Sequence, residues 1–352
     1  MCSTPGREDN TMALLEIKNL HLMMRSFEGR AHILNGINLS VERGEVWGLV
    51  GETGCGKSVT GLSVSRLLPS PPAEYVQGEI LFDGQDMLKA DEPTMRALRG
   101  RRIGMIFQDP TTNLNPVFRI SEQMIDVALH VATHDPGLLG VARHASRRDK
   151  RAAARQVAIQ MLDKVGIPQA AERVDMYPHE FSGGMRQRVL IAMALIGKPE
   201  LLIADEPTTA LDVSVQAQVL RLIHGLVQEF NLGVVLITHN LGVVAQVCTH
   251  VAVMYAGNIV ESGPVRAIFK NPRHPYTRAL LNAIPSARMK RGDLVGLAGT
   301  VPNLVAPPPG CRFAPRCEFA QPECRERLPA AIEVTPAHQV HCILARDVVA
   351  VA

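Results

Sequence analysis

The sequence predicts an α/β fold built around a largely parallel sheet, with a helical insertion and a small cysteine-rich C-terminal extension. Apolar segments typical of buried strands alternate with helical segments over most of the chain. A glycine-rich loop, residues 51–58, stands between one such strand and a helix. Another apolar segment, residues 201–204, ends in the adjacent acids Asp205 and Glu206. These features place polar groups at the carboxyl edge of a parallel sheet, where ligands bind.

Size and composition describe an ordinary globular protein. The chain has 352 residues, of which 46% are hydrophobic and 20% charged, so it can form one large domain or two modest ones. The net charge of +3 is too small to suggest nucleic acid as a partner. The polar first ten residues predict no secretory signal, and the apolar runs are shorter than the roughly 18 residues of a membrane span. We therefore expect a soluble, cytoplasmic protein.

Residues 51–58 fit the phosphate-binding P-loop pattern G-x-x-x-x-G-K-[ST]. Its glycines let the backbone curl so that several N–H groups point at one anion. Lys57 is expected to reach the β- and γ-phosphates, and Ser58 to offer its hydroxyl to Mg²⁺. A strand expected at 45–50 and a helix expected at 58–68 give the loop its required setting. The residues expected to bind nucleotide here are Gly51, Glu52, Thr53, Gly54, Cys55, Gly56, Lys57, Ser58 and Val59.

Several segments around the P-loop predict further strands. Residues 14–20 and 33–41 alternate as strands do, with Phe27 ahead of the Gly29 turn as either a core residue or an adenine platform. A short strand is expected at 78–84. Residues 101–107 form another, and it delivers Gln108 as either an ordinary loop residue or a group that reaches a metal or water.

A helical insertion is expected between the strands. The pattern is helical from residue 120 to about 171, and its basic stretch is typical of a solvated helix face. A further helix opens at Ser182, a natural N-cap, followed by Gly183 and Gly184. A plain capped helix is one interpretation. Because two glycines weaken a first turn, an anion-facing role for their backbone N–H groups is favoured.

Two later strands end in polar residues. The carboxylates that follow residues 201–204 are costly at the end of a buried strand unless they hold a cation or polarise water. Asp205 is therefore the expected Mg²⁺ partner and Glu206 the expected water-activating group. Residues 234–238 predict a strand that ends in His239, a candidate sensor of the γ-phosphate. Residues 251–255 and 258–261 predict a closing hairpin.

Six motifs in order resemble those of ABC-transporter ATPases. They are residues 51–58 (Walker A), Gln108 (Q-loop), 182–188 (signature), 201–206 (Walker B), Asp212 (D-loop) and His239 (H-switch). The resemblance implies a P-loop NTPase (RecA-like) core with antiparallel β strands and a helical ABC subdomain. It implies an ABC ATPase domain at 13–262, with the helical subdomain at about 110–182, and a C-terminal extension at 263–352. It also implies a head-to-tail pair of such domains, with each ATP held between one P-loop and the other signature helix.

The same resemblance assigns roles to single residues. It implies that Phe27 stacks on adenine and that Gln108, with residues 109–116, faces the coupling helices of membrane partners. The residues implied to act in catalysis are Glu206, His239, Lys57 and Gln108. The implied Mg²⁺ ligands are Ser58, Gln108 and Asp205. The remaining implied nucleotide contacts are Ser182, Gly183, Gly184, Gln187, Asp212 and His239.

A narrower resemblance concerns the C-terminal part. Residues 271–281 and 307–317 are similar to the extension of the oligopeptide and dipeptide permease ATPases, nickel importers included. That branch implies an importer with an extracytoplasmic substrate-binding protein, two membrane permeases and two different ATPase subunits. This chain would be one ATPase subunit, at the cytoplasmic face of the inner membrane. Peptide, nickel or another small solute remains open as cargo.

Four cysteines crowd into the tail as Cys311-x5-Cys317-x6-Cys324-x17-Cys342. Zinc prefers paired C-x₂₋₄-C knuckles, and no such pair is present. A [4Fe–4S] cluster needs four cysteines without one fixed short spacing, and members of the peptide-importer branch with this tail are associated with it. We therefore expect such a cluster, with zinc and free thiols as alternatives. His338 and His341 are either substitute ligands or surface histidines.

Two other classes of protein compete with the importer subunit. A soluble ABC ATPase of translation or DNA repair typically has two cassettes or a long coiled-coil insertion, and this chain shows neither. A non-catalytic regulatory subunit would not need an intact Lys57, Asp205, Glu206 and His239.

Overall fold

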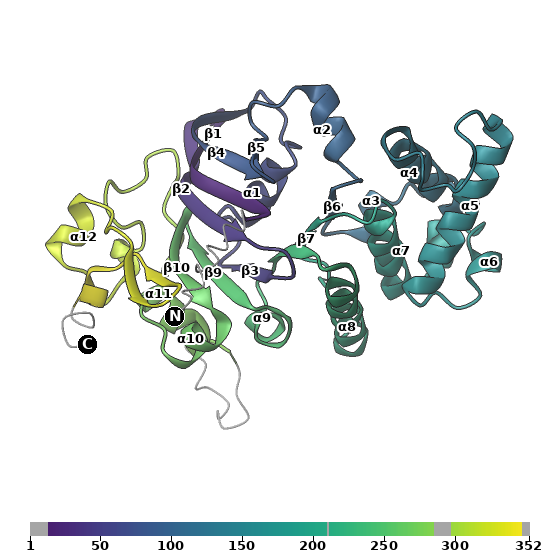
Figure 1. Ribbon diagram of the computed structural model, residues 1–352. Coiled ribbons are helices and arrows are strands. Elements are labelled where there is room, and N and C mark those ends of the chain that lie inside the picture. The colour runs from purple at the N-terminus through teal and green to yellow at the C-terminus, as the bar shows by residue number, and fades with distance from the viewer. Residues whose placement is uncertain (1–12, 210, 285–296, 347–352) are drawn as a thin grey trace, which may run out of the picture.

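The computed structural model describes residues 13–209, 211–284 and 297–346, which form two sheets surrounded by helices (Figure 1). An antiparallel four-stranded sheet has the order β2-β1-β4-β5, and the main eight-stranded sheet has the order β11-β12-β10-β9-β3-β8-β7-β6. The strands are β1 (Leu15–Ser26), β2 (Gly29–Val41), β3 (Val46–Val50), β4 (Ala73–Phe82), β5 (Gln85–Asp86), β6 (Ile103–Ile106), β7 (Leu201–Asp205), β8 (Gly233–Ile237), β9 (His250–Tyr255), β10 (Asn258–Pro264), β11 (Ile332–Thr335) and β12 (His338–Val340).

The centre of the main sheet is parallel, from β6 through β7, β8 and β3 to β9. Alternate residues of these strands enter different cores. In β7, Leu201 and Ile203 join the core under the antiparallel sheet, whereas Leu202 and Ala204 join the core under the helices. Both faces are therefore buried, which explains why these strands read as continuous apolar runs. Their carboxyl ends lie along one edge, where the predicted polar residues follow.

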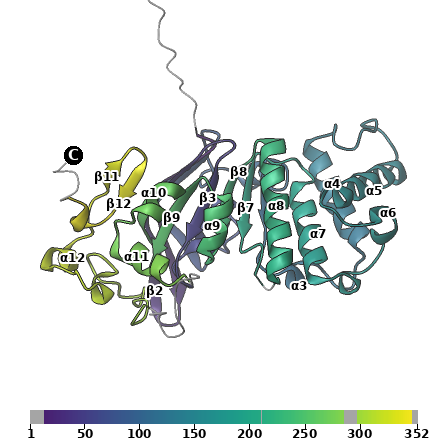
Figure 2. The same ribbon diagram turned by 90° about the horizontal axis from the view of Figure 1, so that it is seen from below.

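The helices fall into a central group and a lateral group. Figures 1 and 2 show α4, α5, α6 and α7 gathered at one end of the molecule, beyond α8 and apart from the antiparallel sheet. The helices are α1 (Lys57–Val64), α2 (Glu92–Leu98), α3 (Pro110–Asn113), α4 (Ile120–His134), α5 (Arg147–Lys164), α6 (Ala170–Arg173), α7 (Gly183–Leu195), α8 (Val213–Phe230), α9 (Leu241–Val247), α10 (Val265–Lys270), α11 (Pro275–Asn282) and α12 (Pro322–Glu326). Three short 3₁₀ turns complete the described elements, η1 (Pro178–Glu180), η2 (Ala314–Arg316) and η3 (Ile343–Ala345).

Two helix boundaries differ from the prediction. The helix expected at 58–68 ends at Val64, because Ser65 caps it and Arg66 adopts a left-handed backbone conformation (φ 47°). The pattern expected to be helical from 120 to 171 divides into α4, α5 and α6, with turns in residues 135–146. Among the described residues, none of the helices combines the length and the apolar character needed to cross a bilayer.

The C-terminal part is built onto the edge of the main sheet. Strand β12 pairs antiparallel with β10, through Glu261 and Val340 among others, and β11 pairs with β12. Beside it, Tyr255 of β9, Tyr276 of α11 and Phe313 pack edge-on or tilted, with ring centroids 4.7 to 5.4 Å apart. The predicted hairpin forms as β9 and β10, which are antiparallel neighbours. The extension therefore shares both a sheet and an apolar core with the central fold.

Candidate active site

The P-loop leaves the carboxyl end of β3 and leads directly into α1. Gly51 packs so closely on β9 that a Cβ there would lie 2.0 Å from the carbonyl oxygen of Met254. Gly56 ends the loop in a left-handed conformation (φ 106°) that favours glycine. The loop is therefore a tight curl, and α1 begins directly after it, so the N-terminus of α1 faces the space inside the loop. This geometry is suited to cradling a phosphate chain.

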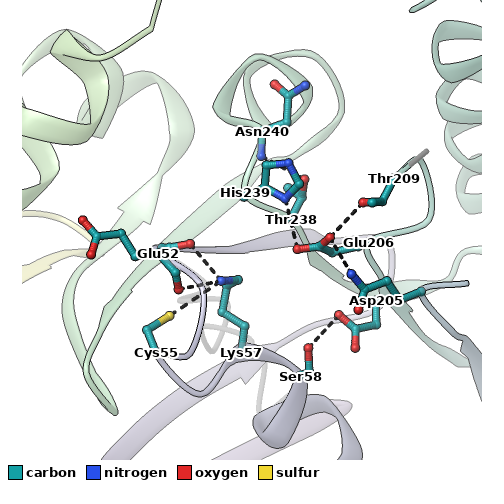
Figure 3. Close-up of polar contacts among 12 residues, drawn as sticks. Glu52, Cys55, Lys57, Ser58, Asp205, Glu206, Thr209, Thr238, His239 and Asn240 are labelled. Atoms are coloured by element: carbon teal, nitrogen blue, oxygen red, sulfur yellow. Dashed lines mark hydrogen bonds and ion pairs between the residues drawn. The ribbon is translucent and has the colours of Figure 1, made fainter. Parts of the chain in front are cut away.

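The Lys57 side chain lies inside the loop and is 6% exposed. Its Nζ donates hydrogen bonds to the carbonyl oxygens of Gly51 at 2.8 Å and Glu52 at 3.0 Å, as Figure 3 shows. Cys55 Sγ lies 3.7 Å from the same nitrogen, and burial raises the pKa of the Cys55 thiol. The loop therefore holds a buried ammonium group that can face an anion.

Ser58 and Asp205 meet across the site. Ser58 Oγ donates a hydrogen bond to Asp205 Oδ1 at 3.0 Å, joining α1 to the end of β7. Burial raises the pKa of Asp205, and the neighbouring Glu206 adds to this effect. Carboxylate and hydroxyl oxygens are the protein ligands that Mg²⁺ prefers. The pair therefore fits a shared magnesium ligand set, and the bound ion would balance the carboxylate charge.

Glu206 follows β7 and accepts hydrogen bonds from three side chains, of which Figure 3 labels Thr209 and His239. Its Oε2 accepts hydrogen bonds from Gln108 Nε2 at 3.0 Å and from Thr209 Oγ1 at 2.8 Å. Its Oε1 lies 3.0 Å from His239 Nδ1. Burial opposes the charge of Glu206, but the hydrogen bonds from His239 and Thr209 outweigh burial and lower its pKa. The carboxylate is therefore ionised and oriented, as a general base must be.

Backbone geometry explains the direction of the Glu206 side chain. Glu206 adopts a left-handed conformation (φ 45°), which is unusual for a residue other than glycine and is found often at functional sites. Its N–H donates to the carbonyl oxygen of Ile237 in β8 at 2.9 Å. The strand thus turns sharply at its end while remaining bonded to its neighbour.

His239 reaches Glu206 from the end of the adjacent strand, β8. Its side chain is 59% exposed, so only part of it is held by the protein. The chain then enters α9, where Asn240 caps the first turn by accepting hydrogen bonds from Gly242 and Val243. The cap fixes where α9 begins and therefore where His239 emerges.

The predicted signature helix lies elsewhere in the chain. Ser182 caps α7 by accepting a hydrogen bond from the Met185 N–H at 3.3 Å, as the sequence predicts. A Cβ on Gly184 would lie 2.4 Å from Val215 Cγ1, so close packing against α8 is a second reason for glycine there. No hydrogen bond in the described residues joins 182–184 to the P-loop, and Figure 1 shows α7 far from α1.

Other predicted site residues are also outside this network. Phe27 is fully exposed at the turn between β1 and β2. The Gln187 side chain is buried in α7, and its Nε2 has no hydrogen-bond partner within the described residues. Asp212 caps α8 by accepting hydrogen bonds from the Val215 N–H and the Ser214 hydroxyl, which hold its pKa low. The nucleotide roles of Phe27, Gln187 and Asp212 stay predictions.

Thr209 belongs to none of the predicted site residues, yet its hydroxyl makes the shortest of the three side-chain hydrogen bonds to Glu206. Thr209 lies in the turn that follows β7 and also donates its backbone N–H to the Glu206 carbonyl. The signal available in the sequence is only its position, three residues after a strand-end carboxylate.

The four tail cysteines come together although they lie on different elements. All four line one small cavity, together with His274, His341, Phe313 and Phe319, and none forms a disulfide. Burial raises the pKa of Cys342 to about 11, and the other three thiols add to this rise. Within 13–209, 211–284 and 297–346, however, no group of three or more His, Cys, Asp or Glu side chains is placed so that it could hold a metal ion. Four converging thiols nevertheless fit the donor set of an iron–sulfur cluster.

Comparison with known protein families identifies the fold that carries this site. Residues 34–209 match the family described as "ABC transporter", and residues 260–324 match "Oligopeptide/dipeptide transporter, C-terminal region". The chain is 48% identical over 337 residues to the "Probable peptide ABC transporter ATP-binding protein y4tR" of Sinorhizobium fredii, covering 96% of each chain. This chain belongs to the ABC transporter ATP-binding family. It is an ATPase of the oligopeptide/dipeptide branch, a family that hydrolyses ATP to power transport.

Other members of this ABC branch match almost end to end. The "Dipeptide transport ATP-binding protein DppD" of Bacillus subtilis is 44% identical over 331 residues, covering 94% of each chain. Among solved structures, one described as the dimeric structure of a bacterial ABC transporter cassette superposes with a TM-score of 0.59 at 26% identity. The match covers 72% of this chain and 99% of that cassette, so the ABC cassette fold is confirmed.

Proposed function

We propose that this chain is the ATP-binding and hydrolysing subunit that powers an importer of dipeptides and oligopeptides. The observation that carries the catalytic part is the ionised Glu206 held by Gln108, Thr209 and His239, beside the Ser58–Asp205 pair. The C-terminal match and the relatives named for peptide transport support the cargo class. Nickel or another small solute is the competing cargo.

In the proposed reaction, Glu206 takes a proton from water as the water oxygen bonds to the γ-phosphorus. The bond from that phosphorus to the bridging oxygen breaks, and ADP leaves with the electron pair. Lys57, the P-loop amides and His239 stabilise charge on the phosphates. A magnesium ion held by Ser58 and Asp205, with Gln108 as a further ligand, would neutralise the β- and γ-oxygens.

The signature helix of one subunit would serve the P-loop of another. Ser182, Gly183 and Gly184 lie at the exposed N-terminus of α7, far from the P-loop of the same chain. A head-to-tail pair would bring them to a neighbouring γ-phosphate, and the solved cassette in the comparison is described as dimeric. Asp212 and Gln187 would support that interface, and Phe27 would stack on the adenine.

Replacing Glu206 tests the catalytic assignment directly. Glu206→Gln keeps the shape of the side chain, but its amide has a single acceptor oxygen, so it can accept from Thr209 or from His239 but not from both. It also cannot take the proton. We expect ATP binding within about two-fold of wild type and hydrolysis roughly 100-fold slower or more, with accumulation of the ATP-bound dimer. Hydrolysis at the wild-type rate would remove Glu206 from the role of base. Glu42→Gln, which changes an exposed carboxylate in the turn before β3, at the opposite end of that strand from the P-loop, is the matched control.

We propose that the chain works with a second, different ATPase subunit, two permeases and an extracytoplasmic binding protein, at the cytoplasmic face of the inner membrane. Residues 13–262 would form the ATPase domain, with its helical subdomain at about 110–182, and residues 263–352 the extension. Gln108 and residues 109–116 would face the permeases. Co-purification from membranes tests the assembly. Recovery of two permeases and a second ATPase is expected, whereas recovery only with ribosomes or DNA-repair proteins would favour a soluble ABC ATPase.

We also propose that Cys311, Cys317, Cys324 and Cys342 hold a [4Fe–4S] cluster, as in the four-cysteine type of this branch. Their convergence on one cavity supports the proposal, and the absence of a C-x₂₋₄-C pair in the tail argues against zinc. The cluster would cross-link the short segments around η2, α12 and η3, so its role would be structural.

Anaerobic purification followed by metal analysis tests this proposal. We expect about four iron and four sulfide per chain, with absorbance in the 400 nm region. Cys324→Ser should lose most of the iron, whereas Cys248→Ala, a change outside the tail, should retain it. Stoichiometric zinc without iron would contradict the cluster.

A further inference from the structure

Arg316 connects the cysteine-rich extension to the P-loop. Its guanidinium forms a two-pronged ion pair with the Glu52 carboxylate, Nη1 to Oε2 at 2.8 Å and Nη2 to Oε1 at 3.1 Å. The pair joins residues 264 positions apart in the chain, and the Arg316 side chain is only 6% exposed. A planar, two-pronged pair of this kind fixes orientation as well as charge.

The remaining donors of Arg316 are also satisfied. Nη1 donates to Tyr255 Oη at 3.3 Å, Nε to the Ala298 carbonyl at 2.8 Å and Nη2 to the Leu297 carbonyl at 3.1 Å. All five N–H groups of the guanidinium therefore have partners. Although burial opposes the charge, the hydrogen bonds to Glu52 and Tyr255 raise the pKa of Arg316. The group is a permanent cation held rigidly against the loop.

Glu52 is held at all three of its polar groups. Its carbonyl oxygen accepts the hydrogen bond from Lys57, within the P-loop itself. Its N–H donates to the hydroxyl of Tyr276 in α11 at 2.9 Å, and its carboxylate binds Arg316. Two of these three contacts come from beyond residue 262. The P-loop thus depends on the C-terminal extension for its position.

The residues that contact Glu52 from the extension, Tyr276 and Arg316, belong to one packed group of side chains. Tyr276 is fully buried, and its ring packs with Tyr255 and Phe313. The Arg316 guanidinium lies 5.7 Å from the centre of the Tyr255 ring. Phe313 and Arg316 lie between Cys311 and Cys317, so the cysteine segment and the P-loop are connected through these rings.

We propose that Arg316 and Tyr276 are positioning residues for the P-loop, through which the C-terminal extension sets the affinity of the site for ATP. The phosphate-binding amides follow Glu52 directly, so their direction depends on how Glu52 is held. Without Arg316, Glu52 would also leave an unpaired carboxylate beside a site for a polyanion. The inference requires ATP binding, which the family shares, and does not depend on the cargo or on an iron–sulfur cluster.

Binding of Mg·ATP to the full-length chain tests the proposal. Arg316→Ala should weaken ATP binding roughly ten-fold, and Tyr276→Phe, which keeps the ring and removes only the hydroxyl, roughly three-fold. Arg316→Lys should resemble Arg316→Ala, because one ammonium cannot replace the two-pronged pair. In the assembled complex, KM for ATP should rise while kcat at saturating ATP stays within about two-fold of wild type.

A double variant and a matched control separate positioning from general damage. Because Arg316 and Glu52 act as a pair, the variant that combines Arg316→Ala with Glu52→Gln should bind ATP no more weakly than Arg316→Ala alone. Arg346→Ala removes an equal charge from the extension, at a surface pair with Glu323, and should bind ATP normally. Wild-type affinity in both Arg316→Ala and Tyr276→Phe would overturn the proposal. The proposal would also be overturned if the double variant bound ATP much more weakly than Arg316→Ala alone. A fall in kcat with an unchanged KM for ATP in the Arg316→Ala complex would overturn it as well.

Discussion

Glu206 accepts hydrogen bonds from the side chains of three residues, and the presence of two of these residues at the site could be predicted from sequence. Gln108 and His239 each follow an apolar strand, and the ends of parallel strands meet at one edge of a sheet. Thr209 could not be predicted in the same way, because a hydroxyl in a turn has no periodic pattern. The Arg316–Glu52 pair was also invisible in sequence, since its members are far apart and only the fold brings them together.

The Thr209 hydroxyl is expected to orient the Glu206 carboxylate. Thr209→Val removes the hydroxyl donor to Glu206 and leaves a side chain of similar shape. We expect kcat for ATP hydrolysis to fall roughly 3- to 10-fold with little change in ATP affinity, because the carboxylate loses orientation rather than the phosphates losing contacts. Steady-state hydrolysis and equilibrium binding measure the two effects. Thr209→Ser keeps the hydroxyl and should retain most activity; a loss in Thr209→Ser as large as in Thr209→Val would argue against the hydrogen bond.

The order of the secondary-structure elements could be predicted better than their pairing. The strands at the centre of the main sheet are apolar runs with a local signal, and the β9–β10 hairpin follows from proximity in sequence. Nothing local predicts that β12 would extend the main sheet by pairing with β10, because β11 and β12 are short and their partner is distant. The helical insertion was predicted, but its division into α4, α5 and α6 was not.

Glu261 holds the junction of β10 with the extension. Its carboxylate is fully buried and accepts hydrogen bonds from the Arg273 and His274 N–H groups at 2.8 and 3.0 Å, and it lies 2.8 Å from His338 Nε2. Burial opposes its charge, but these hydrogen bonds outweigh burial and hold the pKa of Glu261 below its ordinary value. The charged form is therefore the one that stabilises the fold.

This junction predicts a dependence of stability on pH. Since the folded pKa of Glu261 is below the unfolded one, its contribution is fully present above about pH 4.5 and is lost as pH falls through the folded value. Glu261→Gln should lower the free energy of unfolding by about 2 kcal/mol at pH 7, and less at low pH. Urea unfolding at several pH values measures both effects.

The control is Glu333→Gln, which replaces an exposed carboxylate on β11. This variant should keep the free energy of unfolding within about 0.5 kcal/mol of wild type. A destabilisation by Glu261→Gln that stayed constant from pH 7 to pH 3 would contradict the assigned pKa direction.

In this chain, the residues proposed to bind ATP lie at two separate places. The P-loop, Asp205 and Glu206 gather at one edge of the main sheet, whereas the N-terminus of α7 lies in the lateral helical group. The order of motifs in the sequence predicted both sets of residues. The family resemblance also implied that the two sets face different nucleotides, but the place of the helical group beside the sheet is known only from the fold. The extension adds a third part, which contacts the P-loop at Glu52.

We propose that ATP hydrolysis at Glu206 powers the import of peptides. The most direct measurement is uptake of a labelled oligopeptide by vesicles that contain the assembled complex, with the binding protein on one side and ATP on the other. We predict ATP-dependent accumulation with the wild-type chain and none with Glu206→Gln, although both bind ATP. Equal accumulation with the two chains would contradict the role of Glu206, and ATP hydrolysis by the wild-type complex without any peptide uptake would contradict peptide import.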